Sequence, residues 1–162
     1  MDAQKRVLEL LDTLGIKYDI MHHRAAFTVQ DMDELQLDCY GYGVKNLFVR
    51  DAKGKRFFLI VLGIEKRADL KGIQEQLGCS RLSFASEDRL NEHLAIPKGS
   101  VSPLAIINDH SHSVEMVFDR DLQGKERLGV HPNDNTATLW ISFEALTRVI
   151  GHSGHTFRFI DV

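Results

Sequence analysis

The chain has 162 residues, of which 43% are hydrophobic and 27% are charged, and its formal net charge is −3. This size predicts a single domain over residues 1–162, and the charge is not that of a general nucleic-acid binder. The longest apolar run, FFLIVLG, is too short to span a membrane. Because Cys39 and Cys79 provide neither a disulfide framework nor zinc-ligand spacing, we expect a cytoplasmic protein with reduced thiols.

The first third of the chain predicts two helices and three strands. Residues 4–14 carry apolar side chains on one face and stop at Gly15, which indicates an amphipathic helix rather than a signal peptide. Next we expect a strand over KYDIMHH, a helix over TVQDMDELQL with Thr28 as a candidate N-cap, and the strands VKNLFVRD and RFFLIVLG. The last two strands flank the turn AKGK, which contains Gly54, and their apolar runs predict burial on both faces.

The remainder predicts three further helices among short strands. RADLKGIQEQLG stops at Gly78, SEDRLNEHLA begins at Ser86, and SFEALTRVIG is capped by Ser142 and closed by Gly151. The expected strands are RLSFAS, VSPLAIIND, SVEMVFDRDL, TATLWIS and HTFRFIDV. Hairpins and crossovers are mixed in one unit, so we predict the α+β class with a mixed β-sheet.

The charge is unevenly distributed along the chain. KNLFVRDAKGKR carries five basic residues against the single Asp51, and more lysine and arginine follow it. A solvated hairpin explains such a stretch, and a contact with one end of an RNA is compatible with it.

The pentapeptide Gly99-Ser100-Val101-Ser102-Pro103 precedes an apolar run. Gly99 permits a positive φ, and Pro103 fixes its own φ and favours an extended conformation at Ser102. The N–H groups of residues 100–102 then form a fixed array that suits a carbonyl oxygen becoming an oxyanion. A plain surface turn has the same composition, so the pattern alone leaves both interpretations open.

Two further residues stand out. Lys45 begins an apolar strand. It is either an edge residue whose ammonium reaches solvent or a charge positioned for function. His131 precedes Pro132 and should be extended, where it either orients a water or a ribose hydroxyl or bonds to the backbone of a turn.

The histidines occur in pairs, but no pattern completes a metal site. His110 and His112 are two residues apart, and His152 and His155 are three apart, without further ligands at suitable spacing. We therefore expect neither a metal nor another cofactor.

Three segments in this order, VKNLFVRDAKGKRFFLIVL, KGSVSPLAIIND and HPNDNTATLWIS, resemble the YbaK-like aminoacyl-tRNA deacylases. The resemblance is greatest to the branch related to the editing domain of prolyl-tRNA synthetase, the free-standing PrdX-type alanyl-tRNA(Pro) deacylases. It implies a barrel-like mixed sheet surrounded by helices, and metal-free hydrolysis of the ester between a wrong amino acid and the 3′ end of tRNA(Pro). The implied partners are that aminoacylated 3′ end and prolyl-tRNA synthetase.

The resemblance also implies roles for individual residues. The family's strand lysine is matched by Lys45, its Gly-x-x-x-Pro loop by Gly99–Pro103 and its late histidine by His131, and these imply catalytic roles for Lys45, Gly99 and His131. Asn46 matches a neighbouring family asparagine. The implied substrate-binding residues are Asn46, Thr28, Ser100, Val101, Ser102 and Pro103.

Neighbouring strand residues face opposite sides, so Lys45 and Asn46 are expected to share a pocket only at a bulge or a strand end. No serine or cysteine is placed as a nucleophile, so we expect a water to attack. Alternatives are a deacylase for Cys-tRNA(Pro) or another small amino acid, and a catalytically silent module that binds tRNA or a synthetase.

Overall fold

A computed structural model describes residues 2–26, 28–35 and 40–162. The strands are β1 (Asp19–His22), β2 (Tyr42–Arg50), β3 (Phe57–Gly63), β4 (Ser83–Phe84), β5 (Val114–Asp119), β6 (Leu128–Val130), β7 (Ala137–Ile141) and β8 (Phe157–Ile160). The α-helices are α1 (Ala3–Thr13), α2 (Val29–Glu34), α3 (Leu70–Leu77), α4 (Glu87–Leu94) and α5 (Phe143–His152). Two 3₁₀ helices are η2 (Pro103–Asn108) and η3 (Arg120–Leu122).

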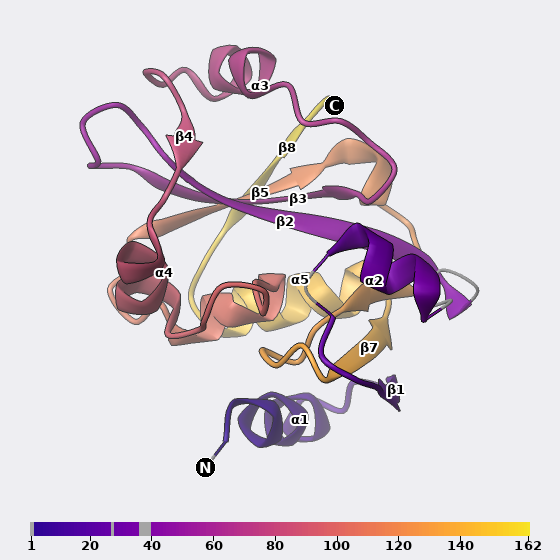
Figure 1. The fold of residues 1–162 in the computed structure, drawn as a ribbon. Helices are drawn as coiled ribbons and strands as arrows, with labels where there is room; N and C mark the ends of the chain where they lie inside the picture. Colours follow the sequence, from indigo (N-terminus) through magenta and orange to yellow (C-terminus); the bar gives the residue numbers. More distant parts are fainter. Residues whose placement is uncertain (1, 27, 36–39) are drawn as a thin grey trace.

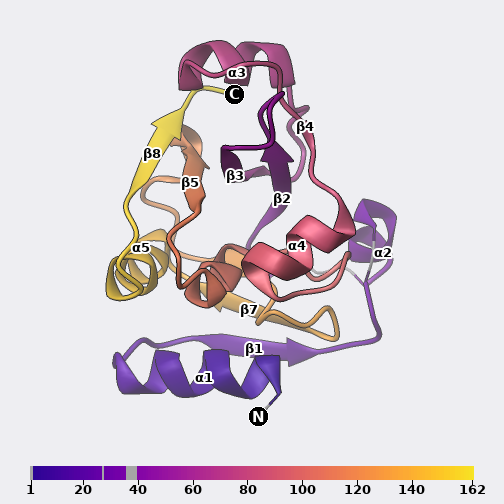
Figure 2. The same ribbon diagram turned by 90° about the vertical axis from the view of Figure 1, so that its left-hand side faces the viewer.

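The strands form one mixed sheet in the order β1-β7-β6-β2-β3-β5-β8, and β4 pairs with β2. β2 is antiparallel to β3 and β4 but parallel to β6, and β3, β5 and β8 run parallel to one another. β2 therefore joins two halves of the sheet, which enclose α4, η2 and α5 (Figures 1 and 2). The predicted α+β class and its mixed sheet surrounded by helices are confirmed.

Every residue of β3 is buried, because alternate side chains enter two different cores. Phe57, Leu59 and Val61 belong to the large core that also contains α1, η2 and α5. Their neighbours Phe58 and Ile60 belong to a smaller core under α3, which covers the upper face of the sheet in Figure 2. Burial on both faces is thus confirmed for β3 but not for the middle of β2, which remains partly exposed.

The expected strand VSPLAIIND is wrong, because its central residues form the helix η2. Pro103 occupies the first turn, and the Ser102 hydroxyl accepts a hydrogen bond from the Leu104 N–H at 3.2 Å. The four residues from Pro103 to Ile106 are all buried. A short apolar run that is buried on all sides shows no alternation of apolar and polar residues. Its sequence therefore does not distinguish a helix from a strand.

The predicted helix starts at Ser86 and Ser142 are confirmed, since each hydroxyl caps its helix. Gly78 ends α3 in the left-handed conformation as predicted. Gly151 does not close α5, which continues to His152 and is capped by Ser153. A glycine at a φ below zero continues a helix at modest cost, so its presence does not fix the end.

Part of the expected helix over residues 28–37 is observed as α2. Its last two residues, and Cys39, lie outside the described residues. Cys79 is a free, partly buried thiol. Across the described part of the chain, no helix combines the length and the apolar character needed to cross a membrane.

Candidate active site

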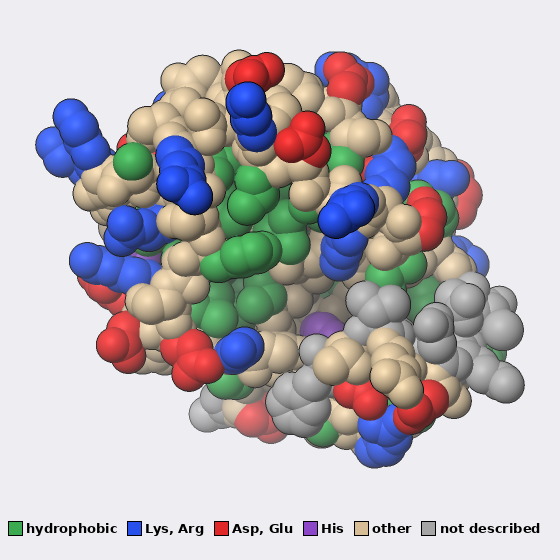
Figure 3. All heavy atoms as spheres, turned by 45° about the horizontal axis from the view of Figure 1, so that its top comes forward, with side chains coloured by type: hydrophobic (Ala, Val, Ile, Leu, Met, Phe, Trp, Pro, Cys, Tyr) green, Lys and Arg blue, Asp and Glu red, His purple; other side chains and the backbone are tan. Residues whose placement is uncertain are grey.

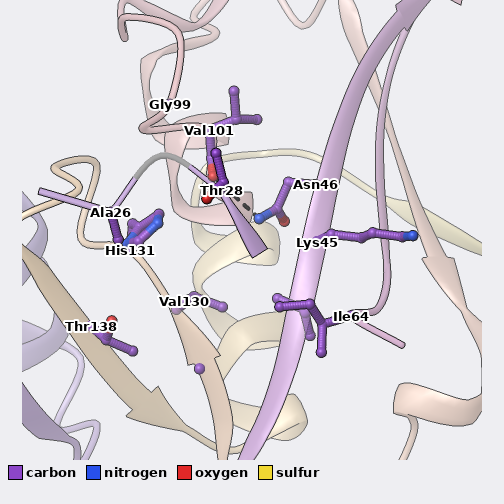
Figure 4. A pocket seen from close by; sticks show the side chains of 12 residues that line it. Ala26, Thr28, Lys45, Asn46, Ile64, Gly99, Val101, Val130, His131 and Thr138 are labelled. Carbon is purple, nitrogen blue, oxygen red and sulfur yellow. Dashed lines mark hydrogen bonds between the residues drawn. The ribbon is translucent and has the colours of Figure 1, made fainter. Parts of the chain in front are cut away.

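The candidate site is a cavity at an unpaired part of β2. One edge of β2 pairs with β3 from Val44 to Arg50. The opposite edge pairs with β6 only at Tyr42 and Gly43, and with β4 only at Val49 and Arg50. A cavity of about 250 Å³ lies beside the stretch between them. Its lining is Ala26, Thr28, Val44, Lys45, Asn46, Ile64, Gly99, Val101, Gly129, Val130, His131 and Thr138 (Figure 4).

Asn46 connects β2 to the loop that precedes η2. Its Nδ2 donates a hydrogen bond to the Val101 carbonyl oxygen at 3.2 Å, marked by the dashed line in Figure 4. Its Oδ1 is buried and has no hydrogen-bond partner among the described residues. Burying an acceptor without a partner costs free energy of about 1–3 kcal/mol. A ligand that donates a hydrogen bond to this oxygen removes that cost.

Lys45 lies on the opposite face of β2 from Asn46. The β2–β3 register is regular here, with Lys45 opposite Leu62 and Asn46 opposite Val61, so no bulge places both side chains together. In Figure 4 the Lys45 ammonium points away from Asn46 and His131. It makes no ion pair within the described parts of the chain. Lys45 therefore contributes a half-exposed charge to the rim of the cavity.

The Gly99–Pro103 loop presents fewer free donors than its sequence suggests. Gly99 adopts a φ of 92°, as predicted for a glycine. The Ser100 N–H donates to the Pro97 carbonyl oxygen at 3.2 Å and is not free. The N–H groups of Val101 and Ser102 have no acceptor in the described residues. Only Val101 lines the cavity, since Ser102 is fully buried, so one of the three expected donors remains for a ligand.

Among the two loop serines, Ser102 holds the loop in place through its hydroxyl. Ser100 and Ser102 are both buried. The Ser102 hydroxyl donates to the His131 carbonyl oxygen at 2.6 Å while it caps η2. It thereby fixes the loop against the end of β6. Its position supports the expectation that no serine acts as a nucleophile here.

His131 has one fixed ring nitrogen and one free one. Its Nδ1 lies 3.0 Å from the Ala137 carbonyl oxygen, which can only accept, so Nδ1 carries the proton. Burial lowers the pKa of His131, and the bond to Ala137 opposes this only partly. The neutral ring leaves Nε2 as an acceptor, and no described residue donates to it.

Thr28 lies at the exposed margin of the cavity and caps α2. Its Oγ1 accepts from the Asp31 N–H at 3.1 Å, and its own N–H donates to the Asp31 carboxylate at 3.1 Å. The N-cap prediction is confirmed by this reciprocal pair.

Sequence reasoning missed Thr138 and His23. Thr138 lines the cavity beside His131, and its hydroxyl lies 2.8 Å from His23 Nε2. Val130 pairs with Leu139, so the next pair of the same ladder would place His131 opposite Thr138. Extending the hairpin register in the sequence could therefore have found Thr138. No local signal marked His23, which arrives from β1.

One histidine from each of the two sequence pairs meets the other in the fold. His112 and His155 have ring centroids 4.5 Å apart, and His155 Nε2 bonds to Asp109 at 2.9 Å. No three metal-binding side chains gather at one point in the described ranges.

Comparison with known proteins identifies the family of this domain. The model of the family described as aminoacyl-tRNA editing domain matches residues 23–149, and the chain belongs to this family. The resemblance inferred from the sequence is thus confirmed.

Individual relatives indicate which kind of aminoacyl-tRNA editing protein the chain resembles. The prolyl-tRNA editing protein ProX of Acetoanaerobium sticklandii is 43% identical over 162 residues, which are 100% of this chain and 99% of that protein. Prolyl-tRNA synthetase associated domain-containing protein 1 of Danio rerio is 34% identical over 158 residues, or 96% and 85% of the two chains. A crystal structure described as a candidate trans-editing enzyme for prolyl tRNA synthetase superimposes with a TM-score of 0.73 at 20% identity, covering 99% and 96%. The chain is therefore a homologue of a prolyl-tRNA editing protein.

Proposed function

We propose that this chain is a trans-editing hydrolase that removes a wrong amino acid from tRNA(Pro), with Ala-tRNA(Pro) as its preferred substrate. The observation that carries the proposal is the set of unpartnered polar atoms at the cavity. Asn46 Oδ1 and His131 Nε2 are free acceptors, and Val101 provides a free N–H donor. The name of the ProX relative supports prolyl-tRNA as the substrate class.

These groups suit the hydrolysis of an ester. A water attacks the aminoacyl carbonyl carbon, and the resulting oxyanion accepts a hydrogen bond from the N–H group of Val101. The bond to the ribose 3′ oxygen then breaks, and the proton lost by the water passes to that oxygen. The products are a free amino acid and an uncharged tRNA. Asn46 Oδ1 accepts from the α-ammonium group of the substrate, and His131 Nε2 accepts from the attacking water or from the vicinal ribose hydroxyl.

The proton transfer uses the substrate's own ribose hydroxyl, since no carboxylate lines the cavity within the described residues. Lys45 binds the terminal phosphate rather than the carbonyl, because its ammonium points outward from the cavity (Figure 4). The same proposal includes a cytoplasmic location, where the charged tRNA and prolyl-tRNA synthetase are found.

A small cavity distinguishes between substrates by excluding amino acids whose side chains are too large for it. A methyl side chain and a hydroxymethyl side chain differ little in size, whereas the proline ring is larger and rigid. One methylene in an apolar pocket is worth about 1–3 kcal/mol, and overfilling a packed site adds strain. We therefore expect hydrolysis of alanine first, then serine, with proline spared.

The test is release of labelled amino acid from tRNA(Pro) charged in turn with alanine, serine, cysteine and proline. The proposal expects alanine to be released fastest. Faster release of cysteine would assign the chain to the Cys-tRNA(Pro) alternative, and release of proline would remove the proofreading role. A protein that binds tRNA(Pro) but releases no amino acid would be the silent module.

A further inference from the structure

Phe84 is a large aromatic side chain that the fold leaves in solvent. It is 64% exposed, the most exposed of the large hydrophobic residues in the described ranges. Both residues of β4 are exposed, and β4 touches the sheet only through the end of β2. Figure 3 shows an apolar area in the centre of this side of the molecule, with a histidine side chain below it. Packing in the hydrophobic core therefore does not explain why a phenylalanine occupies position 84.

The β2 ladder places Phe84 close to the cavity. Phe84 pairs with Val49, so it shares a face of the sheet with Val49, Leu47 and Lys45. Val49 is three residues from Asn46, which is about 10 Å along a strand. Phe84 thus lies outside the cavity, on the face of β2 where the Lys45 ammonium also lies.

Basic residues lie on the segments next to Phe84. Arg50 pairs with Ser83, so its side chain faces the opposite side of β2 from Phe84, and its guanidinium donates to the Ala52 carbonyl oxygen at 3.4 Å. Arg81 precedes Phe84 by three residues. Lys53 extends from the adjoining hairpin. None of these three forms an ion pair within the described residues. Together with Lys45 they exceed the two acids in the first turn of α4. Figure 3 shows both basic and acidic side chains around the apolar area.

We propose that Phe84 is a stacking platform for a base in the unpaired 3′ end of the RNA substrate, with Lys45 contacting an adjoining phosphate. An exposed ring beside free cations is the combination that binds single-stranded nucleic acid without reading its sequence. This inference rests on the proposed function, because it places the RNA by the ester in the cavity. It adds a binding site outside the cavity that holds the strand while the aminoacyl group is inside.

The experiment measures binding and catalysis separately. Binding is followed by fluorescence anisotropy with an uncharged, labelled RNA oligonucleotide ending in CCA, for the wild type, Phe84→Ala and Phe84→Trp. Tyr40→Ala is the matched control, since Tyr40 is the other exposed aromatic residue in the described ranges, at 48%. Steady-state deacylation of Ala-tRNA(Pro) gives kcat and KM for the same four proteins. Analytical ultracentrifugation of the wild type and Phe84→Ala reports self-association.

We expect Phe84→Ala to weaken oligonucleotide binding about 5- to 100-fold and to raise KM by a similar factor, with kcat unchanged. Phe84→Trp should bind at least as tightly as the wild type, and the introduced indole should be quenched by the oligonucleotide. The native Trp140 is only 4% exposed and contributes little to that signal. Tyr40→Ala should bind and react as the wild type does.

Unchanged binding and KM in Phe84→Ala would overturn the inference while leaving the proposed function intact. A wild-type dimer that Phe84→Ala dissociates would also overturn it, because the surface would then bind a second copy. If the wild type binds the oligonucleotide through Phe84 but deacylates no charged tRNA, the platform stands and the proposed function fails.

Discussion

The molecule contains two buried groups of polar side chains around a histidine, and they differ in how completely they are hydrogen-bonded. In the first, Asp109 is 2% exposed and accepts from His155, from the Ser113 and Val114 N–H groups and from the Ser113 hydroxyl. His155 Nδ1 bonds in turn to Ser153 at 2.9 Å. We refer to Asp109, Ser113, Ser153 and His155 as the Asp109 network.

In the second group, at the cavity, Asn46 Oδ1 and His131 Nε2 lack partners among the described residues. Saturated polar groups stabilise a fold, whereas unsatisfied ones cost stability and bind ligands. The difference assigns stability to the Asp109 network and binding to the cavity, although both contain a histidine next to a hydroxyl or a carbonyl.

The largest effect is expected from Asp109→Ala, on stability. It leaves the buried Val114 N–H and His155 without their acceptor, and breaking a buried pair costs about 3–5 kcal/mol. Urea denaturation should show this loss in the free energy of unfolding. At a temperature where the variant is folded, deacylation of Ala-tRNA(Pro) should stay near the wild-type rate. Asp121→Ala is the control, since the side chain of Asp121 is 70% exposed.

The same aspartate predicts the response to acid. Despite its burial, hydrogen bonds from His155 and from the 113–114 backbone lower the pKa of Asp109 below its ordinary 3.8. A carboxyl with a lowered pKa stabilises the fold above the ordinary value, and this contribution is lost as the pH falls through the lowered pKa. Unfolding below pH 4 should therefore be shallower in Asp109→Ala than in the wild type. Parallel stability curves for the two proteins would contradict the assignment.

Lys45→Ala should lower the rate of deacylation about 10- to 100-fold and leave the fold intact. Its ammonium has no partner to lose within the described residues, while a charged hydrogen bond to phosphate is worth about 1.5–3 kcal/mol. Steady-state kinetics and the unfolding curve check the two statements. Lys55→Ala, a change in the same basic hairpin, is the control. Hydrolysis by Lys45→Ala at the wild-type rate would remove the role of Lys45.

Protonation of His131 at lower pH should have a smaller effect on the activity. Burial lowers the pKa of His131 below its ordinary 6.5, so the ring is neutral at pH 7 and Nε2 accepts. Activity that depends on this acceptor should fall to half of its plateau only at a pH below 6.5. The ratio of kcat/KM for the wild type to that for His131→Asn isolates the effect. A ratio that is already halved at pH 6.5 or above would contradict the lowered pKa.

Chelation should have the smallest effect. We expect metal-free chemistry, so dialysis against EDTA should leave the rate of alanine release unchanged. A loss of activity that is restored by added zinc would contradict the metal-free mechanism.

The sequence predicted the class of the fold because its periodic elements, caps and turn glycines are local features. Ser86, Ser142 and Gly78 act at the helix ends where they occur in the chain. The error at VSPLAIIND has the opposite origin, since burial on every side of η2 is set by distant elements and is not visible in the run itself.

For the site, sequence similarity selected six residues that line one cavity, although their orientation was not predictable: Thr28, Lys45, Asn46, Gly99, Val101 and His131. Ser100, Ser102 and Pro103 are buried and do not line it. The separation of Lys45 from Asn46 follows from strand alternation, but which of them faces the loop depends on where β4 and β6 leave β2 unpaired. The partner of the Ser100 N–H and the contribution of Thr138 likewise depend on tertiary contacts.

The comparison between the Asp109 network and the cavity is tested most directly by Asn46→Ala. For this variant, alanine release and stability are measured together. Asn46 Oδ1 is already unpartnered, so the variant loses only the hydrogen bond to Val101, worth about 1 kcal/mol in unfolding free energy. Removing a group that positions the reacting ester costs about 100-fold or more in rate. The account predicts that large loss of rate with a change in stability of about 1 kcal/mol or less. A wild-type rate, or a loss of stability as large as that of Asp109→Ala, would contradict it.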